Sequence, residues 1–409
     1  MTALAKLSDE IRQYLIITTN YWAFTLTDGA LRMLVVLHFY SLGYSPLQIA
    51  MLFLFYEIFG VITNLVGGWL GAHIGLNKTM NIGLLLQVVA LSMLLVPSEW
   101  LTVIWVMAAQ ALSGVAKDLN KMSAKSAIKL LVPKEENGQL YKWVAALTGS
   151  KNALKGVGFF LGGGLLTLIG FKGAVLVMAL GLMMVWIFSL FSLKQDLGRA
   201  KNKPKFSHVF SKSQSVNVLS AARMFLFGSR DVWFVVALPV YLSTSFGWDH
   251  WYVGGFLALW VIGYGAVQGF TPRLTTRSKT RLPDGKDALF WALALSLIPV
   301  MIAVALTYNW HKELVLIVGL MIFGVLFAIN SALHSYLIVS YAGEDGVSLD
   351  VGFYYMANAM GRLIGTVLSG WLYQSYGLGF CLWVSALFIF ITAVISLYLP
   401  KHKRTSASI

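Results

Sequence analysis

Ten basic side chains interrupt long apolar stretches of this chain instead of lying in its polar segments. They are Arg32, Lys117, Lys121, Lys125, Lys129, Lys151, Lys155, Arg223, Arg230 and Arg362. The same stretches contain only four carboxylates: Asp28, Glu57, Asp118 and Asp231. Because Lys and Arg bind oxyanions, and four acids cannot neutralise ten cations, the pattern favours a binding site for a small molecule with several negative charges.

The lysines are spaced so that they share helical faces. Four of them recur every four residues from Lys117 to Lys129, and Lys151 and Lys155 repeat that interval. Residues four apart lie on the same side of an α-helix. The residues that we expect to bind the anion are Lys117, Lys121, Lys125, Lys151, Lys155, Arg230 and Arg362.

The four carboxylates allow two interpretations. Asp28 and Glu57 lie near the middle of their stretches, where a buried acid can carry protons or can simply pair with a nearby cation. Both interpretations stay open for these two residues. Asp118 lies three residues before Lys121, and Asp231 follows Arg230 directly. Both spacings are typical of internal ion pairs. The candidates for such pairs are Arg32, Asp118 and Asp231.

Composition places the helices that carry these residues in a membrane. Hydrophobic residues make up 58% of the 409-residue chain and charged residues only 12%, against about 25% charged in soluble domains. Mean hydropathy is +0.73. Since a soluble protein cannot hide so much apolar surface, most of the chain is predicted to lie in lipid, with the basic stripes lining a hydrated path. Lys129 and Arg223, nearer the ends of their stretches, are expected to extend toward the membrane surface.

We predict an all-α membrane protein with twelve transmembrane helices in two pseudo-symmetric six-helix bundles. A basic linker, 194–216, separates an N-terminal bundle, 1–193, from a C-terminal bundle, 217–409. Sliding one half over the other aligns Lys155 with Arg362 and Gly170 with Gly377, which indicates an ancient duplication. The predicted spans are 14–40, 46–72, 79–96, 102–131, 141–170, 173–193, 217–243, 252–271, 288–308, 314–341, 351–375 and 379–399.

The distribution of loop charges predicts the orientation. Lys and Arg gather in the loops on the side of both termini, whereas the opposite turns carry only Lys172 and Lys312. By the positive-inside rule, both termini and the linker should be cytoplasmic. The net charge of +14 is therefore a topology signal, and nucleic acid is excluded as a partner.

Several kinds of chemistry have no sequence support. The chain has neither a phosphate-binding G-x-x-x-x-G-K-[ST] loop nor an H-E-x-x-H zinc motif, and its one cysteine, Cys381, excludes an internal disulfide or a thiolate metal cluster. We expect no enzymatic activity, no catalytic residue, no cofactor and no metal site.

Two sets of motifs resemble known families. The segment Gly68–Lys78 is similar to the signature loop of the major facilitator superfamily, although Ala72 stands where that pattern has Asp. More specific stretches resemble the organoarsenical efflux permeases of bacterial arsenic-resistance operons, the ArsJ type, which belong to that superfamily. They are Asn20–Arg32, Tyr44–Glu57, Lys117–Ser126 and Thr148–Gly158.

This resemblance implies export of 1-arseno-3-phosphoglycerate, which would confer arsenate resistance. Glyceraldehyde-3-phosphate dehydrogenase, which makes that compound from arsenate, is implied as a functional partner. We expect a bacterial inner-membrane protein that works by alternating access, with proton antiport through Asp28 or Glu57 as the hypothesis for coupling. The cargo's phosphate and arsenate groups suit Lys and Arg, whereas trivalent arsenic would require cysteines. The alternatives are an organophosphate or sugar-phosphate exchanger, an anion channel, and a membrane receptor or scaffold without transport.

Overall fold

The structure is a computed structural model, and outside short turns its described residues are helical. It describes residues 9–44, 52–131, 137–193, 197–200, 213–248, 250–275, 282–344 and 346–400. The predicted linker therefore lies largely outside the described residues, and its boundaries stay a prediction.

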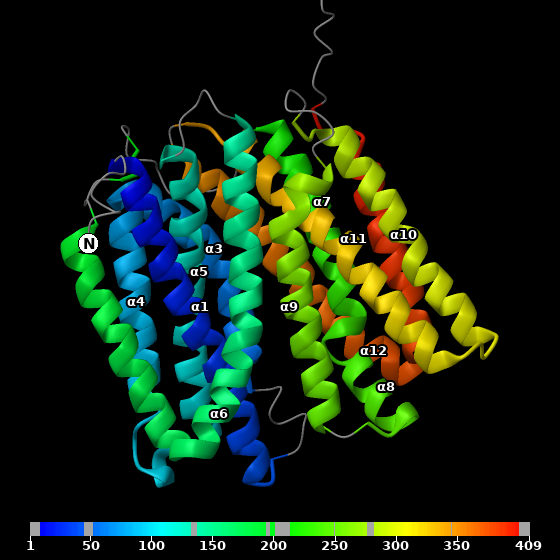
Figure 1. Ribbon diagram of the computed structural model, residues 1–409, viewed down its shortest axis with the longest axis horizontal. Coiled ribbons are helices and arrows are strands. Elements are labelled where there is room, and N and C mark those ends of the chain that lie inside the picture. Colours follow the sequence, from blue (N-terminus) through cyan, green and yellow to red (C-terminus); the bar gives the residue numbers. More distant parts are fainter. Residues whose placement is uncertain are drawn as a thin grey trace, which may run out of the picture.

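Two sets of helices follow one another along the chain (Figure 1). The first set is α1 (Asp9–Ser41), α3 (Leu54–Ile74), α4 (Leu76–Met93), the 3-10 turn η2 (Ser98–Trp100), α5 (Val103–Leu131) and α6 (Asn137–Ser192). The second set is α7 (Gln214–Phe234), α8 (Ala237–Phe246), α9 (His250–Thr275), α10 (Gly285–Thr307), α11 (Lys312–Tyr341) and α12 (Val347–Ser396).

The two longest helices, α6 and α12, each fold back on themselves at a glycine. Gly170 has φ 69° and Gly377 has φ 77°, with ψ near 180° in both, a conformation that essentially only glycine adopts. Each helix therefore supplies two membrane passes. With α7 and α8 counted as one interrupted pass, the described helices make twelve passes, six in each half, as predicted.

The seventh predicted span differs from the expectation of one continuous helix. The structure divides it into α7 and α8 at Val235 and Val236. Pro239 lies in the first turn of α8 and has no N–H to donate to the carbonyl of Val235, which accounts for the interruption.

Charged and polar residues lower the mean hydropathy of some of the membrane-spanning helices. Seven described helical stretches, which include both folded-back helices, are long and apolar enough to cross a membrane. Helices α1 and α5 are also long, but Asp28 and Arg32 in α1 and the lysines of α5 lower their hydropathy. These two helices carry much of the charged cluster described below, so their polarity reflects an interior position.

The halves are joined mainly on one side of the bundle, the side where α6 ends at Ser192 and α7 begins at Gln214, which we call the linker side. One apolar core runs through the first half and continues into residues of α11 and α12, including Tyr336 and Val351. A second core lies within the second half. Figure 1 shows the two bundles next to each other, with α6 beside α9.

Candidate functional site

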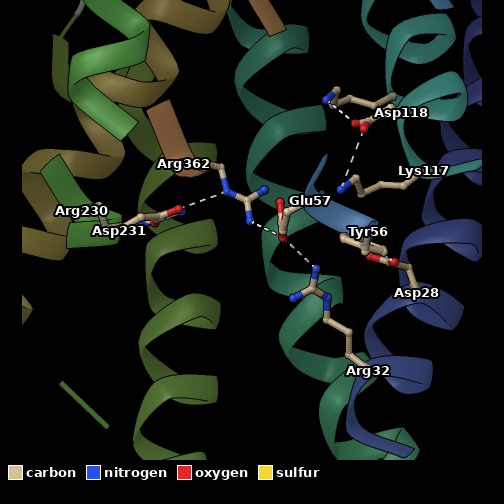
Figure 2. A network of polar contacts seen from close by, with 10 residues as sticks. Asp28, Arg32, Tyr56, Glu57, Lys117, Asp118, Arg230, Asp231 and Arg362 are labelled. Carbon is tan, nitrogen blue, oxygen red and sulfur yellow. Dashed lines mark hydrogen bonds and ion pairs between the residues drawn. The ribbon is translucent and has the colours of Figure 1, made fainter. Parts of the chain in front are cut away.

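An ion-pair network joins the two halves at mid-depth (Figure 2). Glu57 of α3 lies between two arginines: its Oε1 accepts from Nη2 of Arg32 in α1 at 3.1 Å and from Nη2 of Arg362 in α12 at 2.8 Å. Nε of Arg362 also donates to Oδ2 of Asp231 in α7 at 3.1 Å. Arg362 therefore binds one carboxylate from each half, which makes it the centre of the network.

Three further ion pairs between described residues lie on either side of this centre. In α7, Nη2 of Arg230 lies 2.5 Å from Oδ1 of Asp231, whose side chain is fully buried. In α5, Nζ of Lys121 lies 2.6 Å from Oδ1 of Asp118, while Nζ of Lys117 is 4.0 Å from Oδ2. Four of the expected anion-binding residues are thus in contact with carboxylates in this conformation.

The cations of the network keep partial access to solvent. Exposed fractions are 25% for the Arg362 side chain, 15% for Arg230 and 14% for Lys117. Fully dehydrated ions would be much more costly to bury, so partial exposure is consistent with a hydrated space between the halves.

Tyr56 organises the first-half side of the network, and our sequence analysis missed it. Its hydroxyl donates to Oδ1 of Asp28 at 2.7 Å. The Arg32 guanidinium lies 4.3 Å from its ring centroid and the Lys117 ammonium 3.8 Å, both within cation–π range. A tyrosine next to Glu57 in a membrane span was the available sequence signal.

Three of the expected lysines have no carboxylate partner among the described residues. Lys125 donates to the Thr148 hydroxyl, and Nζ of Lys151 lies 3.3 Å from the amide oxygen of Asn152. Within the same described ranges, Lys155 makes neither a hydrogen bond nor an ion pair. These three ammonium groups lie outside the ion pairs of the described residues and add positive charge to the site.

Arg223 does not behave as a snorkelling residue, which corrects the sequence-based expectation for this residue. Arg223 is 3% exposed, and its Nε donates to Oδ1 of Asn358 at 2.8 Å while Nη1 donates to the Ser331 carbonyl at 3.2 Å. Lys129 donates to the backbone carbonyl of Ala342 in the other half. Neutral acceptors inside the protein therefore hold Arg223, whereas Lys129 lies half-buried in the last turn of α5, at its linker-side end.

Glycine contacts set the positions of Lys155 and Arg362. In the first half, α1 approaches α6 so closely that a Cβ on Gly29 would lie 2.6 Å from the Lys155 carbonyl oxygen. In the second half, a Cβ on Gly365 would lie 2.7 Å from the Gly228 carbonyl oxygen. Small residues allow membrane helices to pack at this distance. The same α1–α6 packing is thus repeated by α7 and α12, as expected of a duplicated fold.

Close glycine contacts also join the two halves on the linker side, and we call each of these two contacts a seam. A Cβ on Gly68 of α3 would lie 2.5 Å from the Ser348 carbonyl oxygen of α12. A Cβ on Gly149 of α6 would lie 2.5 Å from the Gly265 carbonyl oxygen of α9. The Ser348 hydroxyl also donates to the Gly68 carbonyl at 2.7 Å. The structure is therefore a conformation in which the halves are packed together on the linker side.

Gly149→Val is expected to open this seam, because the added side chain overlaps backbone atoms of α9 and the helices must separate. We expect a cysteine at Ser335, a buried position of α11, to react at least about tenfold faster with a membrane-impermeant maleimide applied from the linker side. The native Cys381 is buried and gives little background. Gly164→Val is the matched control, since a Cβ there meets nothing within 4 Å. Equal labelling of both variants would show that the seam does not control access.

Comparison with known proteins identifies the fold. Residues 15–345 match the model of the Major Facilitator Superfamily. The chain belongs to this superfamily. It is a multi-pass membrane protein and a secondary transporter of a small molecule, not an enzyme. A search of curated protein sequences finds no match to the chain.

Solved major facilitator structures share its architecture at low sequence identity. The human organic anion transporter MFSD10 (TETRAN) superposes with a TM-score of 0.75 at 15% identity, covering 95% of this chain and 100% of that one. The proton:xylose symporter XylE gives 0.73 at 12%, covering 95% and 96%. A bacterial homologue of the iron transporter ferroportin, in an outward-facing state, gives 0.71 at 15%, covering 93% and 98%.

The superfamily's signature loop, Gly68–Lys78, joins α3 to α4 on the linker side. Ala72, which replaces the acidic residue of the pattern, accepts a hydrogen bond through its carbonyl from the N–H of Ala200 at 2.9 Å. The N–H of Leu76 donates to the Leu197 carbonyl at 2.8 Å. Backbone of segment 197–200 therefore contacts the loop that lacks the usual carboxylate.

Proposed function

We propose that this major facilitator exports a small organic anion with several negative charges, and that the cargo is 1-arseno-3-phosphoglycerate. The observation that carries the proposal is the set of lysines without a carboxylate partner, Lys125, Lys151 and Lys155, beside the Arg362 network. The residue-level resemblance to organoarsenical permeases supports the arsenic-bearing cargo. The proposed location is the bacterial inner membrane, with both termini in the cytoplasm.

The proposed mechanism is exchange of carboxylate partners for substrate oxyanions. A phosphate or arsenate group near Arg362 competes with Glu57 for the guanidinium, while Lys155 and Lys151 supply further charge. Competition weakens the bond between Arg362 and Glu57 that joins the halves. Substrate binding thereby lowers the free energy needed for the halves to move, which is the requirement for alternating access.

The cargo assignment is tested by arsenate challenge of a sensitive bacterium. We expect the chain to raise arsenate tolerance only when glyceraldehyde-3-phosphate dehydrogenase is co-expressed, because the enzyme makes the proposed cargo. Tolerance without the enzyme, or none with it, would contradict the assignment. The rival organophosphate exchanger uses the same cations, and counterflow with glycerol 3-phosphate in proteoliposomes would favour it.

Export against a gradient requires coupling, and we propose proton antiport through Glu57 or Asp28. Protonated Glu57 binds Arg32 and Arg362 less strongly, so proton uptake would release the bond between the halves. We expect Glu57→Gln and Asp28→Asn, tested singly and together in inverted vesicles, to lose accumulation driven by a pH gradient but to keep downhill exchange. Undiminished pH-driven accumulation in the double variant would exclude both carboxylates as proton carriers.

A further inference from the structure

A second site lies away from the charged network, between α4 and the part of α6 that follows Gly170, which we call its second arm. A cavity of about 600 Å³ is lined there by His73, Lys78, Arg199, Ile82, Leu85 and Trp186, among others. Figure 1 shows α4 and this arm side by side at the outer edge of the first bundle. Nothing in the proposed transport mechanism uses this cavity.

The lining of the cavity changes from basic to apolar along its length. His73, Lys78 and Arg199 lie at the linker-side end, where α4 begins and α6 ends. Ile82 and Leu85 of α4 and Trp186 of α6 continue the cavity along the two helices, and Ile82 and Leu85 are 39% and 38% exposed. From Lys78 to Leu85 the helix rises about 10 Å, enough to accompany the upper part of an acyl chain.

Charge and exposure indicate what occupies the cavity. None of the described residues that line it is acidic, and Nδ1 of His73 is buried without a hydrogen-bond partner in the described part of the chain. At the other end of the cavity, the lining residues Ile82 and Leu85 are apolar and exposed. A soluble anion would match only the basic end. An amphiphile with a negative headgroup matches both ends, and basic pockets between membrane helices bind such headgroups.

We propose that this groove binds one anionic phospholipid, with its phosphate at His73, Lys78 and Arg199 and an acyl chain along Ile82, Leu85 and Trp186. The lipid would contact the signature loop and segment 197–200, because His73 and Arg199 belong to these segments. This inference is independent of the transported substrate.

The test is lipid binding to the purified full-length protein in a nonionic detergent, followed by native mass spectrometry with dioleoyl phosphatidylglycerol and with dioleoyl phosphatidylcholine. We expect tighter binding of phosphatidylglycerol. Since each cation near a headgroup contributes about fivefold in affinity, Lys78→Gln with Arg199→Gln should weaken it by about 25-fold. The matched control is Lys142→Gln with Lys286→Gln, two exposed linker-side lysines outside the cavity, which should bind as the unmodified chain does.

Two further measurements separate a bound lipid from a general charge effect. Leu85→Trp fills the apolar end without changing charge and should also weaken phosphatidylglycerol binding at least about fivefold. Phosphatidylglycerol with a diazirine in its acyl chain should label peptides of α4 and of the second arm of α6. Equal affinity for the two lipids, equal loss in the control pair, labelling elsewhere only, or displacement by soluble glycerol phosphate would each overturn the proposal.

Discussion

Arg362→Ala is expected to abolish transport while the protein still inserts in the membrane. The substitution removes a side chain that binds carboxylates of both halves, and it leaves Glu57 and Asp231 with one partner fewer. Breaking a buried ion pair by removing one partner costs about 3–5 kcal/mol. This cost reduces the stability of the protein, whereas transport falls because the cargo loses the guanidinium that binds it. Two charge-assisted hydrogen bonds of about 1.5–3 kcal/mol each correspond to a loss of at least about 100-fold in flux. The measurement is substrate flux in proteoliposomes at matched protein density.

Two companion variants distinguish substrate binding from a purely structural role of Arg362. Arg362→Lys keeps the charge but loses the planar guanidinium that reaches two carboxylates, so we expect partial activity. Glu57→Gln combined with Arg362→Ala removes the unpaired charge together with its partner. If Arg362 binds the cargo, this double variant stays inactive. Recovery of flux in the double variant would show that Arg362 serves only to neutralise Glu57.

Lys155→Ala is expected to have the second large effect on transport. It should raise KM without lowering the thermal stability of the protein. Lys155 has no hydrogen bond or ion pair to another described residue, so its removal breaks none of the ion pairs of the network. Thermal stability should stay the same or rise, because an unpaired cation in a membrane interior is unfavourable. A charge-assisted hydrogen bond to the cargo contributes about 1.5–3 kcal/mol. We therefore expect KM to rise by about 10- to 100-fold, measured as initial flux against substrate concentration.

The matched control for Lys155 is Lys172→Ala, in the same helix α6. Lys172 is exposed near the turn at Gly170, away from the network, and its removal changes net charge equally. We expect its KM to remain within about twofold of the unmodified chain. A similar rise in KM for both variants would reduce the effect to general electrostatics, and no rise for Lys155→Ala would remove that residue from the site.

The helices and the charged cluster were predictable because both leave strong sequence patterns. Long apolar runs give the spans, and a cation inside such a run must face protein or water rather than lipid. The breaks between the predicted spans 141–170 and 173–193, and between 351–375 and 379–399, also coincide with the glycines where α6 and α12 fold back. These features depend on local sequence or on simple repetition.

Which side chains pair with one another inside the protein was not predictable, because the pairing depends on contacts between segments that are distant in the sequence. Glu57 and Arg362 meet only through the packing of α3 against α12, and nothing near either residue specifies the other. Arg223 was expected near the membrane surface because depth was judged by distance along its span, whereas Asn358 binds it inside the protein. Tyr56 was passed over because an aromatic residue in an apolar span usually indicates packing alone.

The most direct test of the central claim is equilibrium binding of a stable polyanion to the purified chain. We would measure 2,3-bisphosphoglycerate, a three-carbon compound with two phosphates, by isothermal titration calorimetry. We expect one molecule bound per chain, with binding lost in Arg362→Ala and Lys155→Ala and retained in Lys172→Ala. Absence of binding to the unmodified chain, or equal binding to all three variants, would contradict the claim that the cations between the two halves form an anion site.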